Sequence, residues 1–290
     1  MTGLVGYEVD GHVARITMRR SEKRNAENVE LIEARDVAFR RAEDDPDVRV
    51  VVLGSEGPSF CAGHDLGQIL TDPDVVAARD GVDGTFEFEW RYYFELSQRV
   101  QQLSKPTIAM VQGACVAGGF VLAAMCDLIV AADDARFSDP VLGFARRPGE
   151  GGEPLSAAAM EVFFHPWQLG VRKAKELLFT GDWLDATEAK ACGFVNRVVP
   201  RDQLDEETMV LARRVASASP AAVALVKRSF EFTQQAMGMQ ESMQFHFLLH
   251  QLRHAGLADG WLRPSATTGA PRSLLDQMRA ARADTRPADQ

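Results

Sequence analysis

Two glycine-rich segments constrain the fold of this chain most strongly. The first is SFCAGHDL, residues 59–66, and the second is QGACVAGGF, residues 112–120. Glycine permits tight turns whose backbone N–H groups stay unpaired and accessible. Two such N–H groups that converge on one point form an oxyanion hole, which stabilises negative charge developing on a carbonyl oxygen. If the fold brings Gly63 and Gly118 together across 55 positions of sequence, the pattern predicts such a site.

The N-terminal half predicts alternating strands and helices. Asp10-Gly11 between two apolar runs indicates a hairpin turn. After it we expect a helix over 27–43 capped by Asn25, a strand over 48–53, a loop over 70–84, a helix over 86–103, a strand over 107–111, a helix over 120–125 and a strand over 127–131. This order is typical of crossover α/β units.

The C-terminal half becomes purely helical after a last short strand. We expect a helix over 167–179, a capped helix that begins after Asp185, a strand over 195–199, and helices over 204–218, 221–237 and 240–254. The chain is therefore predicted to divide into an α/β core at 1–202, a helical region at 203–262 and a partly ordered tail at 263–290.

Charge and cysteine content exclude several classes of function. The net charge is −9 without a basic cluster, which argues against partners such as nucleic acid and anionic membranes. The absence of an apolar run of membrane-spanning length and of a secretion signal predicts a cytoplasmic protein. The four cysteines form no C-x-x-C pair, so we expect buried free thiols, with a nucleophilic role for Cys61 or Cys115 a minor alternative.

Several short motifs occur in an order that identifies a family resemblance. They are KRNA (23–26), SFCAGHDL (59–66), KPTIA (105–109), QGACVAGG (112–119), CD (126–127), FSDP (137–140) and LFTG (178–181). Over residues 6–254 the chain resembles the crotonase superfamily, also called the enoyl-CoA hydratase/isomerase family. The resemblance implies an α/β fold, a crotonase-like ββα spiral core with a C-terminal helical region, and assembly as a homotrimer or a dimer of trimers.

The resemblance also implies a substrate and a way of binding it. Family members bind an acyl-CoA thioester, so coenzyme A would enter as part of the substrate, with no permanently bound cofactor and no metal. The backbone N–H groups of His64 and Gly118 would hold the thioester oxygen. The backbone of Ala62 and Asp65 would meet the adenine.

Further CoA contacts follow from the same resemblance. Arg24, with Ala26 beside it, would lie near the CoA phosphates, and Lys227 is another candidate for a phosphate contact. Ordinary solvated charge is an equally good interpretation of Arg24 and Lys227.

The chain departs from the hydratase pattern at both catalytic positions. The resemblance places one glutamate three residues after the oxyanion glycine and another directly after the proline of FSDP. Val121 and Val141 occupy these positions. Valine neither donates nor accepts a proton, so two-glutamate hydration cannot proceed here in the family's usual way.

Other residues could replace the missing acid and base. Glu161 and His165 have i, i+4 spacing and would share a helix face, either as a catalytic pair or as a structural ion pair. Asp139 lies beside the Val141 position, and His64 is the histidine best placed to face the acyl group. Further candidates, which could equally be core or surface side chains, are Glu89, Tyr92 and Tyr93.

Two functional hypotheses remain at this point. The first is an enzyme that transforms an acyl-CoA with non-standard acid and base residues, by hydration, isomerisation, or hydrolysis of a C–C or thioester bond. The second is a non-catalytic acyl-CoA-binding protein, which the two valines favour.

Overall fold

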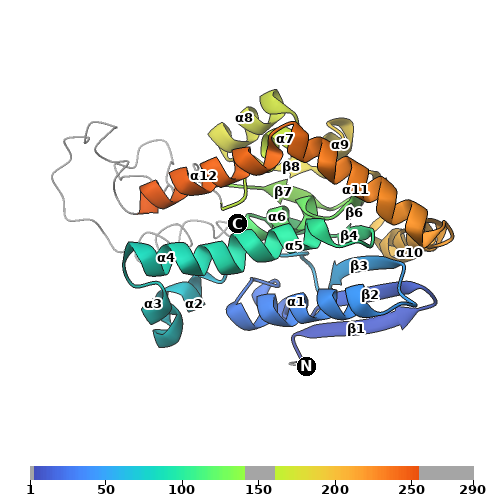
Figure 1. Cartoon of the computed structure of the whole chain (residues 1–290), viewed down its shortest axis with the longest axis horizontal. Helices are drawn as coiled ribbons and strands as arrows, with labels where there is room; N and C mark the ends of the chain where they lie inside the picture. The colour runs from blue at the N-terminus through green and yellow to red at the C-terminus, as the bar shows by residue number, and fades with distance from the viewer. Residues whose placement is uncertain (1–2, 141–160, 255–290) are drawn as a thin grey trace, which may run out of the picture.

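The computed structural model describes residues 3–140 and 161–254 and is built around a six-stranded sheet (Figure 1). The strands lie in the order β1 (Val5–Asp10), β2 (Val13–Met18), β3 (Val50–Ser55), β4 (Thr107–Val111), β6 (Leu128–Ala132) and β9 (Arg197–Val199). The first two strands form an antiparallel hairpin and every later neighbour is parallel. A smaller sheet contains β5 (Ala114–Val116), β7 (Arg136–Ser138) and β8 (Leu184–Asp185).

Alternation along the strands gives the large sheet two apolar faces. In β3, Val50 and Val52 pack on one face, with the core under α10 (Leu204–Ala216). Val51 and Leu53 pack on the other face with the larger core, which includes residues of α1 (Val29–Asp44) and α6 (Gly118–Ala124). A strand buried on both faces has a continuous β-branched sequence, which is why the sequence revealed it. The predicted crotonase-type α/β fold is confirmed.

Helices carry the chain between the strands and cover both faces (Figure 1). The remaining α-helices are α2 (Leu66–Thr71), α3 (Pro73–Ala78), α4 (Gly81–Glu89), α5 (Leu96–Gln102), α7 (His165–Gln168), α8 (Val171–Thr180), α9 (Ala186–Ala191), α11 (Pro220–Ala236) and α12 (Met239–His254). Single 3₁₀ turns occupy Ser21–Lys23 and Arg201–Gln203.

The prediction of a loop over 70–84 is wrong, because this segment forms α3 and part of α2 and α4. The aspartates and the proline that suggested a loop act as helix starts. The Asp72 carboxylate accepts hydrogen bonds from the N–H groups of Asp74 and Val75, and Pro73 occupies the first helical position. Proline is favoured there because its fixed φ suits a helix and it has no N–H to leave unpaired.

The predicted cap at Asn25 is also wrong, because Asn28 caps α1 by accepting from the Leu31 N–H. Asn25 adopts a left-handed φ of 53°, and its side-chain amide donates to the carbonyls of Glu56 and Ser59, 2.9 Å from each. Asn25 therefore ties the chain before α1 to the start of the first glycine segment. The helix begins two residues later than expected, which leaves Glu27 outside it.

A π-helix interrupts the long helix that the sequence predicted over 86–103. Residues Trp90–Glu95 form this π-helix, η2, between α4 and α5. π-helical turns are rare and occur often at functional sites. The segment contributes Tyr92 and Tyr93 to the site described below.

The last three described helices confirm the predicted helical region. They follow one another along the chain as α10, α11 and α12 (Figure 1). The predicted tail at 263–290 lies outside the described residues. Over the described part of the chain no single helix is long and apolar enough to span a membrane; the segments 201–216 and 220–236 meet the length and composition criteria only as a pair, bent by 102°.

Candidate functional site

The two glycine-rich segments meet through backbone hydrogen bonds. The Cys61 N–H donates to the Ala114 carbonyl at 3.2 Å, and the Val116 N–H donates to the Cys61 carbonyl at 2.9 Å. Gly63 has φ +84°, and a Cβ there would lie 2.9 Å from the Val116 carbonyl oxygen. Glycine is therefore required at position 63 by both conformation and space. The fold brings together the two turns that the sequence singled out.

His64 and Gly118 follow the closest approach of the two turns. Gly118 is the first residue of α6, and Ala117 before it has the unusual φ, ψ pair of 47° and −115°. Within residues 3–140 and 161–254, the N–H groups of His64 and Gly118 have no hydrogen-bond acceptor. The oxyanion role of these two groups stays a prediction.

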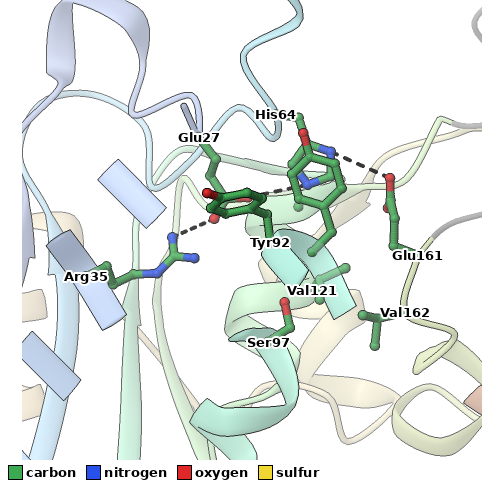
Figure 2. A pocket seen from close by; sticks show the side chains of 10 residues that line it. Glu27, Arg35, His64, Tyr92, Ser97, Val121, Glu161 and Val162 are labelled. Carbon is green, nitrogen blue, oxygen red and sulfur yellow. Dashed lines mark hydrogen bonds and ion pairs between the residues drawn. The ribbon is translucent and has the colours of Figure 1, made fainter. Parts of the chain in front are cut away.

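The imidazole of His64 lies between two carboxylates (Figure 2). His64 Nε2 is 3.8 Å from Glu27 Oε2, and His64 Nδ1 is 3.7 Å from Glu161 Oε1. The ring of Tyr93 stacks on the imidazole with centroids 3.6 Å apart and planes 15° apart. Stacking fixes the plane of the ring, so each nitrogen faces one carboxylate.

Glu27 is held by a buried ion pair with Arg35 of α1. Arg35 Nη1 is 2.5 Å from Glu27 Oε1, and the two side chains are only 6% and 4% exposed. Sequence reasoning missed Glu27 because it assigned the residue to the predicted helix. The available signal was its position directly after the KRNA motif.

Apolar side chains form the remaining wall of this pocket. Val121 and Val162 line it together with Ser97 and Glu161 (Figure 2). Gly118 also lines the pocket. Val121 is buried, so the position of the first hydratase glutamate is filled by an apolar group in the pocket itself. Val141 lies outside the described residues.

The predicted pairing of Glu161 with His165 is wrong. Helix α7 begins at His165, so Glu161 precedes the helix and does not share a face with that histidine. Glu161 instead faces His64, whereas His165 Nε2 lies 3.0 Å from Asp139 Oδ2, with both side chains almost fully buried. His165 and Asp139 do not line the pocket that contains His64. Their proposed catalytic role stays a prediction that this arrangement does not support.

Four of the predicted CoA-binding residues lie in adjoining segments. The Ala62 N–H donates to the Arg24 carbonyl at 3.0 Å, and the Arg20 guanidinium bonds both the Ala26 carbonyl and Asp65, at 2.8 and 2.6 Å. Burial raises the pKa of Asp65, but the hydrogen bond and charge of Arg20, together with the backbone N–H groups of Gln68 and Gly67, lower it by more, so its pKa falls below the ordinary value. The exposed side chain of Arg24 lies at the edge of this group.

Lys227 lies apart from these residues. Its ammonium group is 2.8 Å from Asp127 Oδ2 and 3.1 Å from the Lys105 carbonyl, and the side chain is 7% exposed. In this arrangement the charge of Lys227 is already neutralised by a carboxylate. Phosphate binding by Lys227 therefore stays a prediction.

The cysteines are structural, as the sequence predicted. All four are free thiols, and Cys61, Cys115 and Cys126 are buried. Burial raises the pKa of the Cys61 and Cys115 thiols, and it raises that of Cys126 to about 12. A nucleophilic cysteine needs a thiolate, so neither Cys61 nor Cys115 is suited to that role.

Substitution of Gly118 tests how tightly the site is built. A Cβ at Gly118 would clash with Glu27 Oε2 and would lie 2.8 Å from His64 Nε2. We expect Gly118→Ala to lower the free energy of unfolding by about 1–3 kcal/mol, the usual cost of overpacking, as measured by urea denaturation at one protein concentration. Gly3→Ala is the matched control, because a Cβ there has open space. Equal stability of the two variants would contradict the packing described.

Comparisons with known proteins identify the family and agree with the fold. Residues 8–255 match the family described as Enoyl-CoA hydratase/isomerase. The curated relative "Putative enoyl-CoA hydratase EchA13" from Mycobacterium tuberculosis is 41% identical over 266 residues, which cover 87% of this chain and 80% of that protein.

Two solved structures show the same fold. One is a probable enoyl-CoA hydratase from Mycobacterium thermoresistibile, with 40% identity, a TM-score of 0.77 and coverage of 88% of this chain and 98% of that one. Another, an enoyl-CoA hydratase/isomerase from Xanthobacter autotrophicus Py2, has 30% identity, a TM-score of 0.81 and coverage of 98% and 97%.

Proposed function

The chain belongs to the enoyl-CoA hydratase/isomerase family, and we propose that it is an enzyme that transforms an acyl-CoA thioester with Glu161 and His64 in place of the usual glutamates. The observation that carries this proposal is the position of the His64 imidazole between Glu161 and Glu27, directly beside Gly118. Coenzyme A enters as part of the substrate.

In the proposed mechanism the backbone N–H groups of His64 and Gly118 hold the thioester oxygen. In an isomerisation, and in the dehydration that reverses a hydration, the first chemical change is removal of a proton from the α-carbon of the acyl group. The C–H electron pair moves into the Cα–C bond, the carbonyl π pair moves to the oxygen, and the two N–H donors stabilise the resulting negative charge. Protonation at another carbon then completes an isomerisation; in a hydration, water adds to the β-carbon and the α-carbon receives the proton.

Glu161 is the proposed base. His64 is the group proposed to orient Glu161 and to take up the proton that Glu161 has accepted. The Glu161 side chain is 17% exposed, so it is accessible to a ligand in the pocket, whereas Glu27 is only 4% exposed and already paired with Arg35. A carboxylate next to an imidazole is a common arrangement for general acid–base catalysis. Glu27 contributes a fixed negative charge on the far side of the ring.

Exchange of the α-protons into heavy water tests the proposal. The purified chain is incubated with butyryl-CoA in D₂O, and deuterium at the α-carbon is followed by mass spectrometry. We expect exchange well above the rate without protein. Tight binding of butyryl-CoA without exchange, and without turnover of crotonyl-CoA, would favour the alternative of a non-catalytic acyl-CoA-binding protein.

We also propose that the chain assembles as a homotrimer or a dimer of trimers. Helix α11 leaves Leu225, Phe230 and Phe232 each more than two-thirds exposed, and α12 exposes Phe245 and Leu248. An apolar face of this kind on an acidic chain is suited to burial against other copies. The family's assembly through its C-terminal helices supports the same interpretation.

Introduction of charge on this face is expected to dissociate the assembly. Leu225→Asp combined with Phe232→Asp places two carboxylates seven residues apart on α11. An interface that buries this helix would have to remove water from both charges, which is unfavourable. Size-exclusion chromatography with light scattering should show three or six chains for the unmodified protein and one for the variant. Val9→Asp, at an exposed site on β1, is the control. A monomeric unmodified protein, or an unchanged variant, would contradict this proposal.

A further inference from the structure

A second cluster of ionisable side chains surrounds Glu89, next to the pocket that contains His64. This residue ends α4, and its side chain is 1% exposed. Glu89 Oε2 is 2.8 Å from His250 Nε2 and accepts a hydrogen bond of the same length from the Gln251 amide. Glu89 Oε1 is 2.6 Å from the Arg79 guanidinium and 3.2 Å from His254 Nδ1. Both oxygens of the buried carboxylate are therefore fully engaged.

Two helices far apart in sequence build this cluster. Helix α12 packs on α4 (Figure 1) and directs His250, Gln251 and His254 at one carboxylate. The π-helix η2 starts at the residue after Glu89 and contains Tyr93, which stacks on His64. The same helical segment thus contacts both the cluster and the pocket.

Glu161 joins the cluster to the pocket. Glu161 Oε1 lies 4.0 Å from His250 Nε2 and 3.7 Å from His64 Nδ1. His250 Nε2 accordingly lies between Glu89, in direct contact, and Glu161, slightly farther away. The four side chains form a continuous series from Glu89 through His250 and Glu161 to His64.

Glu89 and His250 are the pair in closest contact in this series. Burial raises the pKa of Glu89, but hydrogen bonds from His250 and His254 lower it by more, so the Glu89 carboxylate stays ionised. An ionised carboxylate in contact with an imidazole favours the protonated ring. The His250 imidazole is therefore held between two carboxylates, with Glu89 the nearer one.

Other ionisable groups also surround Glu89 and His250. Arg79, just after the end of α3, neutralises part of the charge of Glu89, and Tyr93 from η2 has a pKa raised by burial and by Glu161. On α12 itself, His254 shares Glu89, and Arg253 has interactions of its own. His246 has a pKa lowered to about 4, by burial first and then by the charge of His250, so it is neutral near pH 7.

We infer that Glu89 and His250 are positioning residues for Glu161: the buried pair orients the Glu161 carboxyl group toward His64. This inference rests on the proposed function, in which Glu161 is the base. Neither Glu89 nor His250 lines the pocket, so they act through Glu161.

A metal site is the competing interpretation of the same residues. The ligand atoms of Glu89, His250 and His254 lie within 4.8 Å of one another, which is compatible with a zinc-type ion. The Arg79 guanidinium and the Gln251 amide on the two Glu89 oxygens favour the positioning role, because an ion would have to compete with them. Substitution of His254 separates the two interpretations.

Isosteric substitution of Glu89 tests the inference. We expect Glu89→Gln and His250→Gln each to lower kcat by about tenfold with little change in KM. Glu95→Gln, an exposed residue of η2, is the control and should retain the unmodified rate. His254→Asn should also stay within about twofold, since His254 does not lie between Glu89 and Glu161.

A second readout does not need turnover. With ¹³C-labelled glutamate, the NMR resonance of the Glu161 carboxyl group at pH 7 should shift in Glu89→Gln and stay in place in Glu95→Gln. An unchanged Glu161 resonance in a folded Glu89→Gln variant would overturn the inference while leaving the proposed function intact. Equal losses in His254→Asn and Glu89→Gln, with one zinc bound per chain after dialysis against ZnCl₂, would overturn it in favour of the metal site.

Discussion

Glu161→Gln is expected to lower kcat by about 10²–10⁴-fold, the usual contribution of a positioned general acid or base. The amide has the same shape as the carboxylate but cannot accept the α-proton, so the loss should appear in kcat more than in KM. The fold-loss in kcat is obtained from the rates of α-proton exchange and of turnover, measured on the same preparation. Thermal unfolding of the variant confirms that the fold is retained.

The control for Glu161→Gln is the same substitution at Glu176. That residue lies on α8 and is 63% exposed in a surface pair with Lys173. A solvated glutamate of this kind contributes little, so its variant should match the unmodified rate. If Glu161→Gln retained full activity while His64→Ala lost it, Glu27 or the imidazole itself would be the base, and the assignment to Glu161 would be wrong.

Arg35→Met is expected to destabilise the protein by about 3–5 kcal/mol, the range measured when one partner of a buried ion pair is removed. The substitution leaves the Glu27 carboxyl group 4% exposed and without its 2.5 Å partner. Methionine fills much of the space of the arginine stem, so the loss reports on the charge rather than on a cavity. Urea denaturation at fixed protein concentration measures the change.

Two further variants show whether the loss of stability comes from breaking the Glu27–Arg35 ion pair. Glu27→Gln combined with Arg35→Met should recover most of the stability, because no unpaired charge stays buried. Arg213→Met removes an exposed pair with Asp10 and should cost at most about 1 kcal/mol. Equal losses for Arg35→Met and Arg213→Met would mean that Glu27 is hydrated and is no fixed charge beside His64.

Local patterns in the sequence predicted the parts of the fold that depend on local physics. β3 and β4 are buried β-branched runs, and their periodicity leaves little choice of structure. The hairpin at Asp10-Gly11 follows from its turn residues. Helices α2 to α4 were missed because aspartate and proline are compatible with both a loop and a helix start, and only the surrounding packing distinguishes the two.

The candidate site was predictable in its backbone and in single side chains such as His64 and Glu161, but not in how those side chains pair. The glycine segments indicated two close turns, and the structure joins them at Cys61 and Cys115. The i, i+4 spacing of Glu161 and His165 suggested a pair, but α7 starts too late to form it. Glu27, Glu161 and His250 come together from three distant segments, and no short-range pattern encodes such a contact.

A crystal structure with a bound acyl-CoA tests the proposed thioester site most directly. We predict that the thioester oxygen lies about 2.7–3.1 Å from the backbone nitrogens of both His64 and Gly118. We also predict that Glu161 is the carboxylate nearest to the α-carbon, with His64 on its far side. A thioester oxygen bound elsewhere, or an α-carbon out of reach of Glu161, would contradict the proposed mechanism.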